Sequence, residues 1–477
     1  MQLVRKILFF VFVLIYLVLC PLIILYSFGY ILKPGQKEVS QTGVIYLSTI
    51  PPSADVYLGD SRFKDKTPTS IHGLVPGKYS VKLKLKGYRS WNKQVNIKAG
   101  KAVSFSKIIL LPQEFNPKSL NSDYNYLDLI PFPGTKYFIL KRGSRFKDFY
   151  LYNQRNQTIE PVIKKETDYK NFAVKSIYHQ KESKIFIGFG GSLWNKKYFL
   201  IDIENKKQTL TDITNLFPEH PDSIIWAGQD RENIFAIYNN HINRLNAKNL
   251  SLYPNYIKQI KGFGLSDDWL YVLRQNNTIL RLRMDKKDET ILFKDRNLGK
   301  DLFNQSNFYQ IRQLEKQVIL FWGDQGDLVT TIPPYHLAKK NIKGVKYSKS
   351  REKLIFWDHA NIWVADFSLI RDSDYLFKDQ AQFARLHNQG ANITQCFWVY
   401  QGNYILFKDG DHVFLLKAEP GRDYHKQHLV RVKKNTKVLY QEDDGYLYYI
   451  SQNGQVMGIE VVPNRSFFAN FIEKEDN

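Results

Sequence analysis

The first feature along the chain is a long apolar run. Residues 7–30 carry no charged side chain and are rich in Leu, Ile, Val and Phe. About 20 such residues, each rising 1.5 Å, span the hydrocarbon core of a bilayer, so the run predicts a transmembrane helix over 7–32. A cleaved signal peptide has a shorter apolar segment that ends in small residues, and Leu19 before Cys20 is too large for a lipoprotein site. We therefore expect an uncleaved anchor.

The orientation of this helix is predicted from its flanks. Arg5 and Lys6 precede the apolar run and Lys33 follows it, so the charge bias between the two sides is weak. A short basic tip stays inside, and a large domain after the helix is exported largely regardless of its charge. We expect a single-pass protein of the cell membrane, with cytoplasmic residues 1–6, a polar linker over 33–42 and an extracytoplasmic body.

Beyond the linker, the apolar pattern changes to the alternation of β-strands. Between residues 43 and 112, short runs of β-branched and aromatic residues are separated by turn signals rich in Pro, Gly and Asp. The pattern predicts a small all-β module of about 70 residues. Its expected strands are 44–47, 56–58, 79–85, 95–97 and 103–111.

Four segments in this order make the module similar to the PEGA domain family. They are Pro52-Ser53-Ala54 before a strand, Lys66-Thr67-Pro68, Pro76-Gly77-Lys78 and Gly87-Tyr88. The family has Glu-Gly-Ala in the first segment, so Ser53 stands here at the position of the family's glycine. The resemblance implies a small extracytoplasmic β-sandwich of prokaryotic envelope proteins over 43–112, and it implies no catalytic residues.

A repeated hairpin fills the chain from about 119 to 463. In each repeat, a hydrophobic strand leads through a polar turn into a second hydrophobic strand, at spacings of 34 to 50 residues. Such periods, with four short strands each, are typical of β-propellers. We predict one propeller of seven or eight blades, followed by a tail over 464–477, with tandem β-sandwiches as the alternative. The first strands begin near Phe138, Ile185, Ile234, Leu270, Val318, Leu354, Tyr404 and Val438.

Two repeats also resemble blades of the TolB-type or Trp-Asp-type propellers. One contains Trp363-Val364-Ala365-Asp366, and the other contains Leu200-Ile201-Asp202-Ile203. The predicted fold class is therefore all-β, with a single N-terminal transmembrane helix, a small PEGA-like β-sandwich, and then a seven- or eight-bladed β-propeller.

The composition is strongly basic, with 68 Lys and Arg against 46 Asp and Glu, a formal net charge of +22. For a basic exported body, anionic lipids or cell-wall polymers are the natural partners. Codon usage in an AT-rich genome, which favours Lys, Asn, Ile, Tyr and Phe, is the other explanation of the lysine excess. The expected anchor argues against nucleic acid as a partner, and the usual recognition motifs are absent from the sequence.

Motifs of catalysis are also absent from the sequence. It contains no Gly-x-Ser-x-Gly, His-Glu-x-x-His or phosphate-loop motif. We interpret Gly188-Phe189-Gly190-Gly191 as a hairpin turn, and the acidic segments 408–411 and 442–445 as turns because they lack the alternating ligands of a calcium loop. His425 and His428 are expected in a solvated connection. The prediction is no catalytic, metal-binding or cofactor-binding residues.

Lys82, Lys84 and Lys86 form the sharpest local pattern. They alternate with apolar residues, so a strand places three ammonium groups on one face, about 7 Å apart. The surrounding segment 43–112 holds 12 Lys and Arg against three Asp. Two interpretations stay open at this point, protection of an edge strand against aggregation and contact with anionic lipids or wall polymers.

Together these patterns favour binding over catalysis. A propeller offers its faces and central opening to ligands or partner proteins. We expect a membrane-anchored extracytoplasmic binding or scaffold protein of a prokaryotic cell envelope, with the membrane, anionic lipids, wall polymers or envelope proteins as partners. The alternative is an enzyme that acts on envelope glycans or polysaccharides, because its carboxylates could be scattered along the sequence.

Overall fold

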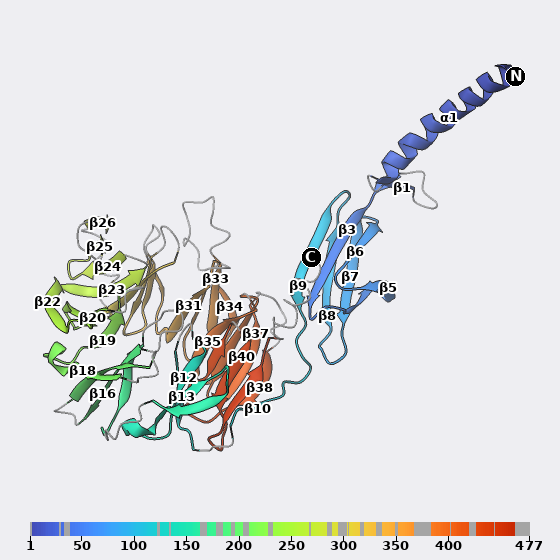
Figure 1. The fold of residues 1–477 in the computed structure, drawn as a ribbon. Coiled ribbons are helices and arrows are strands. Elements are labelled where there is room, and N and C mark those ends of the chain that lie inside the picture. The colour runs from blue at the N-terminus through green and yellow to red at the C-terminus, as the bar shows by residue number, and fades with distance from the viewer. Residues whose placement is uncertain are drawn as a thin grey trace. The chain divides into compact units, whose positions relative to one another are not determined.

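The fold is that of a computed structural model of the 477-residue chain (Figure 1). The chain folds into two compact units, which meet in the sequence between Asn116 and Pro117. We call the part before this point the N-terminal unit, and Pro117–Val462 the propeller unit. The structure describes residues 2–27, 30–32, 39–121, 125–132, 135–162, 169–177, 185–191, 196–203, 209–227, 232–266, 269–283, 289–293, 303, 305–314, 319–330, 336–348, 352–366, 383–400, 402–418, 426–442 and 444–462.

The apolar N-terminal run forms the helix α1 (Gln2–Ser27). Its segment Val4–Pro21 has a mean hydropathy of 2.3, and by length and composition it is the one helix in the described part of the chain that could cross a membrane. The helix begins and ends earlier than the predicted 7–32. Residues 30–32 instead form the strand β1 (Tyr30–Leu32), which pairs with β2 (Val39–Gln41) inside the predicted linker. Residues 33–38 and 463–477 lie outside the described residues.

The rest of the N-terminal unit is a sandwich of two sheets, with strand orders β6-β3-β9 and β5-β4-β7-β8. The apolar side chains between the sheets are buried, because alternate residues of each strand face inward. This core comes from residues 45 to 110 alone. The strand bounds are β3 (Gly43–Ile50), β4 (Asp55–Leu58), β5 (Ser61–Lys66), β6 (Thr69–Leu74), β7 (Gly77–Lys84), β8 (Trp91–Ile97) and β9 (Ala102–Ile109).

All five predicted strands of this module are present, and two further strands were missed. These are β5 and β6, whose sequences SRFKDK and TSIHGL contain few apolar residues. Each has one strongly apolar inward residue near its middle, Phe63 and Ile71, which pack on the core. Such a short pattern does not stand out from the surrounding turns.

Thr67 of the Lys-Thr-Pro segment has a structural role. Its side chain is buried, and its Oγ1 lies 2.5 Å from Thr49 Oγ1 and accepts a hydrogen bond from Ala54 N at 2.9 Å. The Thr67 carbonyl accepts a hydrogen bond from Ser53 N at 2.7 Å. One residue therefore joins β3 to the segment that leads into β4.

Ser53 adopts the left-handed backbone region, with φ of 67°. This conformation costs an L-residue roughly 1–2 kcal/mol, whereas glycine adopts it freely. Ser53→Gly should therefore raise the free energy of unfolding of this module by about 0.5–1 kcal/mol, after the greater entropy of a glycine in the unfolded chain is subtracted. Urea denaturation measures the change. Ser90→Gly is the control, because Ser90 is exposed without a positive φ; equal effects of the two substitutions would contradict the prediction.

The propeller unit is built from four-stranded antiparallel meanders. The first three consist of β11 (Asp128–Pro131), β12 (Tyr137–Lys141), β13 (Phe149–Asn153) and β14 (Thr158–Pro161); β15 (Ala173–Ile177), β16 (Ile185–Gly191), β17 (Lys196–Asp202) and β18 (Thr209–Asp212); and β19 (Ser223–Trp226), β20 (Asn233–Ile237), β21 (His241–Asn246) and β22 (Ser251–Lys258). The next two are β23 (Ile260–Ser266), β24 (Trp269–Arg274), β25 (Ile279–Arg283) and β26 (Glu289–Phe293); and β27 (Tyr309–Gln313), β28 (Ile319–Gly323), β29 (Leu328–Thr330) and β30 (His336–Lys339).

The last three meanders complete the unit. They consist of β31 (Gly344–Ser348), β32 (Lys353–Trp357), β33 (Ile362–Asp366) and β34 (Phe383–His387); β35 (Ile393–Val399), β36 (Tyr404–Asp409), β37 (His412–Lys417) and β38 (Lys426–Arg431); and β39 (Leu439–Gln441), β40 (Tyr446–Ile450) and β41 (Val456–Glu460), with β10 (Lys118–Ser119) as the fourth strand.

These meanders form a closed ring. The strand β10, at the start of the unit, pairs antiparallel with β41 at its end. Apolar clusters join neighbouring meanders, as between the second and third, and a further cluster joins the last to the first, where Phe138 contacts Tyr448. A ring of meanders that is closed by its first strand is a β-propeller, so the alternative of tandem sandwiches is wrong.

Seven of the eight predicted hairpin starts lie at or next to the second strand of a meander, and Val438 lies before the first strand of the last one. The central two strands carry the continuous apolar runs, which is why the sequence shows them best.

The turn predicted at Gly188-Phe189-Gly190-Gly191 is wrong, because these residues end β16. A Cβ on Gly188 would lie 2.8 Å from Cε2 of Phe172, so the glycine leaves room for that ring.

Candidate binding sites

Of the three lysines predicted to share one strand face, Lys82 and Lys84 lie on β7, and Lys86 follows it. Val81 and Leu83 are fully buried between the two sheets, so Lys82 and Lys84 of the same strand point outward. Lys86 lies in the turn after the strand, because β7 ends at Lys84 rather than at residue 85. The expectation of three lysines on one strand face therefore holds for two of them.

β7 is an interior strand of its sheet. Lys82 pairs with Tyr57 of β4 on one side and with Asn92 of β8 on the other. The backbone of β7 is thus bonded to a neighbour on both sides, and it presents no free edge to another chain. Protection of an edge strand is therefore not the reason for these lysines.

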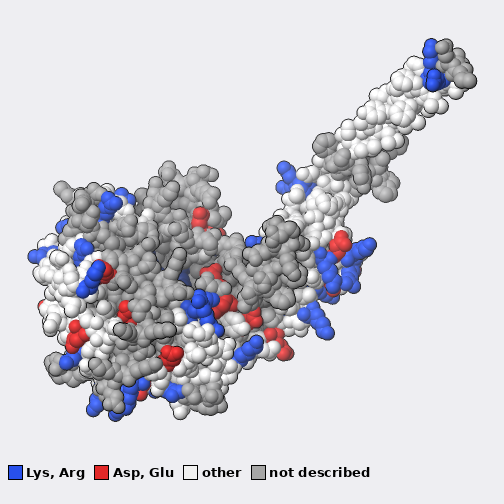
Figure 2. All heavy atoms as spheres, in the orientation of Figure 1, with Lys and Arg blue, Asp and Glu red and all other residues white. Residues whose placement is uncertain are grey.

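The outer face of this sheet gathers several cations around one carboxylate. Asp55 is the cross-strand partner of Lys84, and its Oδ1 lies 2.7 Å from an Arg62 nitrogen and 3.7 Å from Lys66 Nζ. Lys84 Nζ lies 4.9 Å from the centre of the Tyr57 ring, within the range of a cation–π contact. We call this surface, made of Arg62, Lys66, Lys82 and Lys84, the cationic sheet face, and Figure 2 shows the blue side chains that gather there.

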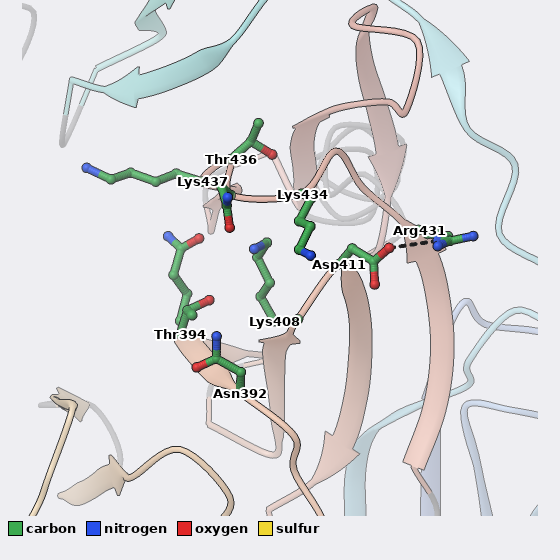
Figure 3. Close-up of a pocket in the computed structure, with 11 residues that line it drawn as sticks. Asn392, Thr394, Lys408, Asp411, Arg431, Lys434, Thr436 and Lys437 are labelled. Carbon is green, nitrogen blue, oxygen red and sulfur yellow. Dashed lines mark hydrogen bonds and ion pairs between the residues drawn. The ribbon is translucent and has the colours of Figure 1, made fainter.

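A second cationic site lies in the propeller unit, at the seventh meander. It is a pocket of about 570 Å³, a volume within the range of small-molecule sites. The pocket is formed by the start of β35, the turn between β36 and β37, and the connection from β38 to β39 (Figure 3). We call it the Lys408 pocket. Its lining is Asn392, Thr394, Gln395, Lys408, Gly410, Asp411, Arg431, Lys434, Asn435, Thr436 and Lys437.

Several polar groups of this lining hold the pocket in shape. Gln395 donates to the Val438 carbonyl at 3.1 Å and accepts from Val438 N at 2.9 Å, which fixes the β38–β39 connection against β35. Thr436 Oγ1 donates to the Lys433 carbonyl at 2.7 Å. These bonds fix the walls of the pocket.

The charges of the pocket are unequal. Its lining contains four cations, Lys408, Arg431, Lys434 and Lys437, against the single carboxylate of Asp411. Burial lowers the pKa of Lys408, and the carboxylates of Asp411 and Asp128 oppose this shift. A hydrogen bond from Arg431 holds the pKa of Asp411 below its usual range. The pocket is therefore a positively charged site.

Among the described residues of the propeller unit, two further pockets have volumes of about 420 and 350 Å³. Asp324 is the carboxylate of the first, and Asp444 is the carboxylate of the second. Each of these three pockets thus has one acidic residue in its lining.

Of the acidic segment 408–411, only Gly410 and Asp411 form the turn between β36 and β37, and the prediction is wrong for Lys408 and Asp409, which end β36. In the acidic segment 442–445, Asp443 lies outside the described residues, and Asp444 accepts hydrogen bonds from Tyr446 N and the Tyr448 hydroxyl.

His425 also lies outside the described residues. His428 is on β38, where its Nε2 lies 2.9 Å from Nδ1 of His412. The described residues contain no group of three His, Cys, Asp or Glu that could hold a metal ion.

Comparison with known proteins agrees with this architecture. Residues 42–110 match the model of the PEGA domain family. No curated protein matches the sequence. Similar solved structures are BamB from Moraxella catarrhalis (11% identity, 73% of this chain and 99% of that one, TM-score 0.42) and the Cps50 (Swd1) β-propeller domain from Myceliophteria thermophila (8% identity, 72% and 100%, TM-score 0.40).

A designed protein, Ika8, is similar at 8% identity, over 72% of this chain and 98% of that one, with a TM-score of 0.44. Such scores and identities carry no argument about function. The fold is established by the closed ring of meanders and by the family match of the first module. The chain therefore carries a PEGA domain at residues 42–110 and, after it, a β-propeller.

Proposed function

We propose that this chain is a membrane-anchored binding or scaffold protein of a prokaryotic cell envelope. In this proposal α1 is an uncleaved anchor, the N-terminus is cytoplasmic, and the PEGA domain and propeller lie outside the cytoplasm. The length and hydropathy of α1 support the anchor. The PEGA match supports an envelope location, since that family's members are expected there.

The character of the pockets carries the choice of binding over catalysis. The lining of the Lys408 pocket is dominated by cations and amides, and its one carboxylate is already bonded to Arg431 at 2.8 Å. A group engaged in this way is a poor general acid or base, because its pKa is lowered and its lone pairs are shared. Such a site holds an anionic ligand better than it transfers protons.

The cationic sheet face extends the same role to the PEGA domain. Its four cations outnumber the carboxylate of Asp55, and the strand that carries two of them is interior. The ten residues from 33 to 42 could reach at most about 35 Å when extended, and β2 within them pairs back on β1, which keeps this domain near the membrane in the proposed topology. Anionic headgroups or wall polymers are the partners that suit this face.

Protease treatment of intact spheroplasts tests the topology. An externally added protease is expected to degrade the PEGA domain and the propeller, and to leave a membrane-embedded N-terminal fragment that contains α1. A version with a tag before Gln2 identifies that fragment by immunoblotting. A full-length product that is protected until the membrane is permeabilised would contradict the proposed orientation, and release of the body as a soluble protein would contradict the anchor.

A further inference from the structure

The strongest unassigned feature of the molecule is the buried lysine of the Lys408 pocket. Lys408 is the penultimate residue of β36, and only 3% of its surface is exposed. Burial of an ammonium group is costly unless it is paired or hydrogen-bonded. Among the residues that the structure describes, no hydrogen bond or ion pair is found at Lys408 Nζ, and this atom ends at the open space of the pocket that Lys408 lines.

The carboxylates near Lys408 are all bonded to other groups. Asp411 bonds to Arg431 Nε at 2.8 Å. Asp409 accepts hydrogen bonds from the backbone N–H groups of Ala391 and Asn392, at 3.0 and 2.6 Å. Asp411 lowers the electrostatic cost of the ammonium group of Lys408, but neither carboxylate forms a hydrogen bond with it.

Asp128 is engaged in the same way. Its Oδ1 accepts hydrogen bonds from the backbone N–H groups of Leu129 and Lys437, each at 2.9 Å. All three neighbouring carboxylates thus have donors of their own, and a ligand is the natural partner for Lys408.

A second ammonium group points to the same space. Figure 3 shows the side-chain ends of Lys408 and Lys434 directed toward each other's side of the pocket, while those of Arg431 and Lys437 point away. The amide of Asn392 is directed upward from the floor of the pocket. Two ammonium groups and the amide of Asn392 thus surround one space, and the one carboxylate of the lining, that of Asp411, is bonded to Arg431.

We propose that the Lys408 pocket binds a phosphate group, held between the ammonium groups of Lys408 and Lys434. A phosphate carries up to two negative charges and several acceptor oxygens, and lysine binds it as a point charge. The proposal rests on the binding role given above and names its ligand chemistry. The phosphate can be free, or it can be part of a polymer or a lipid headgroup.

The test uses the full chain in a neutral detergent and inorganic phosphate as the probe. Isothermal titration calorimetry at constant ionic strength should show saturable binding at one site. Lys408→Met and Lys434→Gln should each weaken this binding by at least about tenfold, because each removes a charge-assisted hydrogen bond. Lys258→Gln is the matched control, since Lys258 is an exposed lysine on the outer strand β22, and its phosphate affinity should equal that of the wild type.

Thermal melts without phosphate separate a lost ligand site from a lost fold. Lys408→Met should melt at or above the wild-type temperature, because a chain of similar length replaces a buried and unpaired cation. Lys434→Gln changes an exposed side chain and should melt as the wild type does. Weaker phosphate binding by both variants without a lower melting temperature supports the site.

The proposal is overturned if the wild type shows no saturable phosphate binding, or if both lysine variants bind phosphate as tightly as the wild type. If the wild type binds phosphate and the lysine variants bind it more weakly, the affinities for glycerol 3-phosphate and for short-chain phosphatidylglycerol distinguish the sources of the phosphate group. A preference for the first indicates a polymer or small metabolite, and a preference for the second indicates a lipid headgroup. The spheroplast experiment does not depend on phosphate, so this proposal can fail while the proposed topology stands.

Discussion

Replacing Gly264 by alanine is expected to lower the free energy of unfolding of the propeller by about 3 kcal/mol or more. Gly264 lies on β23, the strand of the fourth meander that pairs in parallel with β27 of the fifth. A Cβ at this position would lie 2.6 Å from the carbonyl carbon of Ile311 and 2.9 Å from its Cβ. Backbone cannot move aside as a flexible side chain can, so the two strands must separate.

That separation has two costs. Overpacking of a dense core costs typically 1–3 kcal/mol, and the widened gap weakens the strand pairing and the burial of Phe263 beside it. Thermal unfolding followed by circular dichroism should show a melting temperature lower by roughly 5–10 °C.

Gly458→Ala is the matched control for this prediction. Gly458 is on β41 of the same ring, and a Cβ there would meet only side-chain atoms, of Leu120 and Tyr446, at 3.3 to 3.5 Å. The control should melt close to the wild type. If Gly264→Ala also melts within a degree or two of the wild type, the close backbone contact between the fourth and fifth meanders is wrong.

Neutralising the lysines of the PEGA domain is expected to weaken its binding to anionic vesicles by roughly 100-fold. Each lysine near an anionic surface contributes about 1 kcal/mol, so replacement of Lys82, Lys84 and Lys86 by glutamine removes about 3 kcal/mol. The domain has its own core, made from residues 45 to 110, so it can be studied apart from α1. Co-sedimentation with phosphatidylglycerol vesicles measures the affinity, and wild-type binding should fall steeply with added salt.

Three other exposed lysines provide a control with the same change in charge. Lys98, Lys101 and Lys107 lie after β8, before β9 and on β9, and none of them belongs to the cationic sheet face. Their replacement by glutamine should weaken binding much less. Equal losses for the two triple variants would mean that net charge alone drives binding, and no wild-type binding at low salt would remove the functional interpretation of the lysines.

The sequence predicted the fold where hydrophobic patterns are long or regular. The apolar run of α1 and the central strands of the meanders, such as Ile405 to Phe407 on β36, are continuous enough to be recognised. β5 and β6 of the PEGA domain were missed because they contain few apolar residues. The parallel pairing of β23 with β27 joins two neighbouring meanders, with Gly262 and Gly264 close to the β27 backbone, and no local pattern indicates it.

The candidate sites were predicted only in part. The alternation of apolar and charged residues correctly predicted that Lys82 and Lys84 lie on one face of a strand. It could not show that β7 is interior, because the neighbours of a strand in its sheet are set by the topology of the whole domain. Lys408 was treated as part of a turn. A lysine that directly follows the apolar run from Tyr404 to Phe407 was the available signal, since a charge at the end of a buried strand needs a partner. Lys434 comes from a connection about 25 residues later, and only the folded ring brings the two together.

The pairing of β10 with β41 has a consequence for how the protein is made. The two strands are separated by almost the whole propeller, so the ring cannot close until its last strand has been synthesised and, in the proposed topology, has crossed the membrane. Until then, the first and last meanders expose apolar faces that include Phe138 and Tyr448. Contacts between such distant segments form slowly, and exposed apolar faces promote aggregation. A chain shortened before residue 456 would stay in this open form, which makes the end of the propeller a point of high sensitivity to truncation.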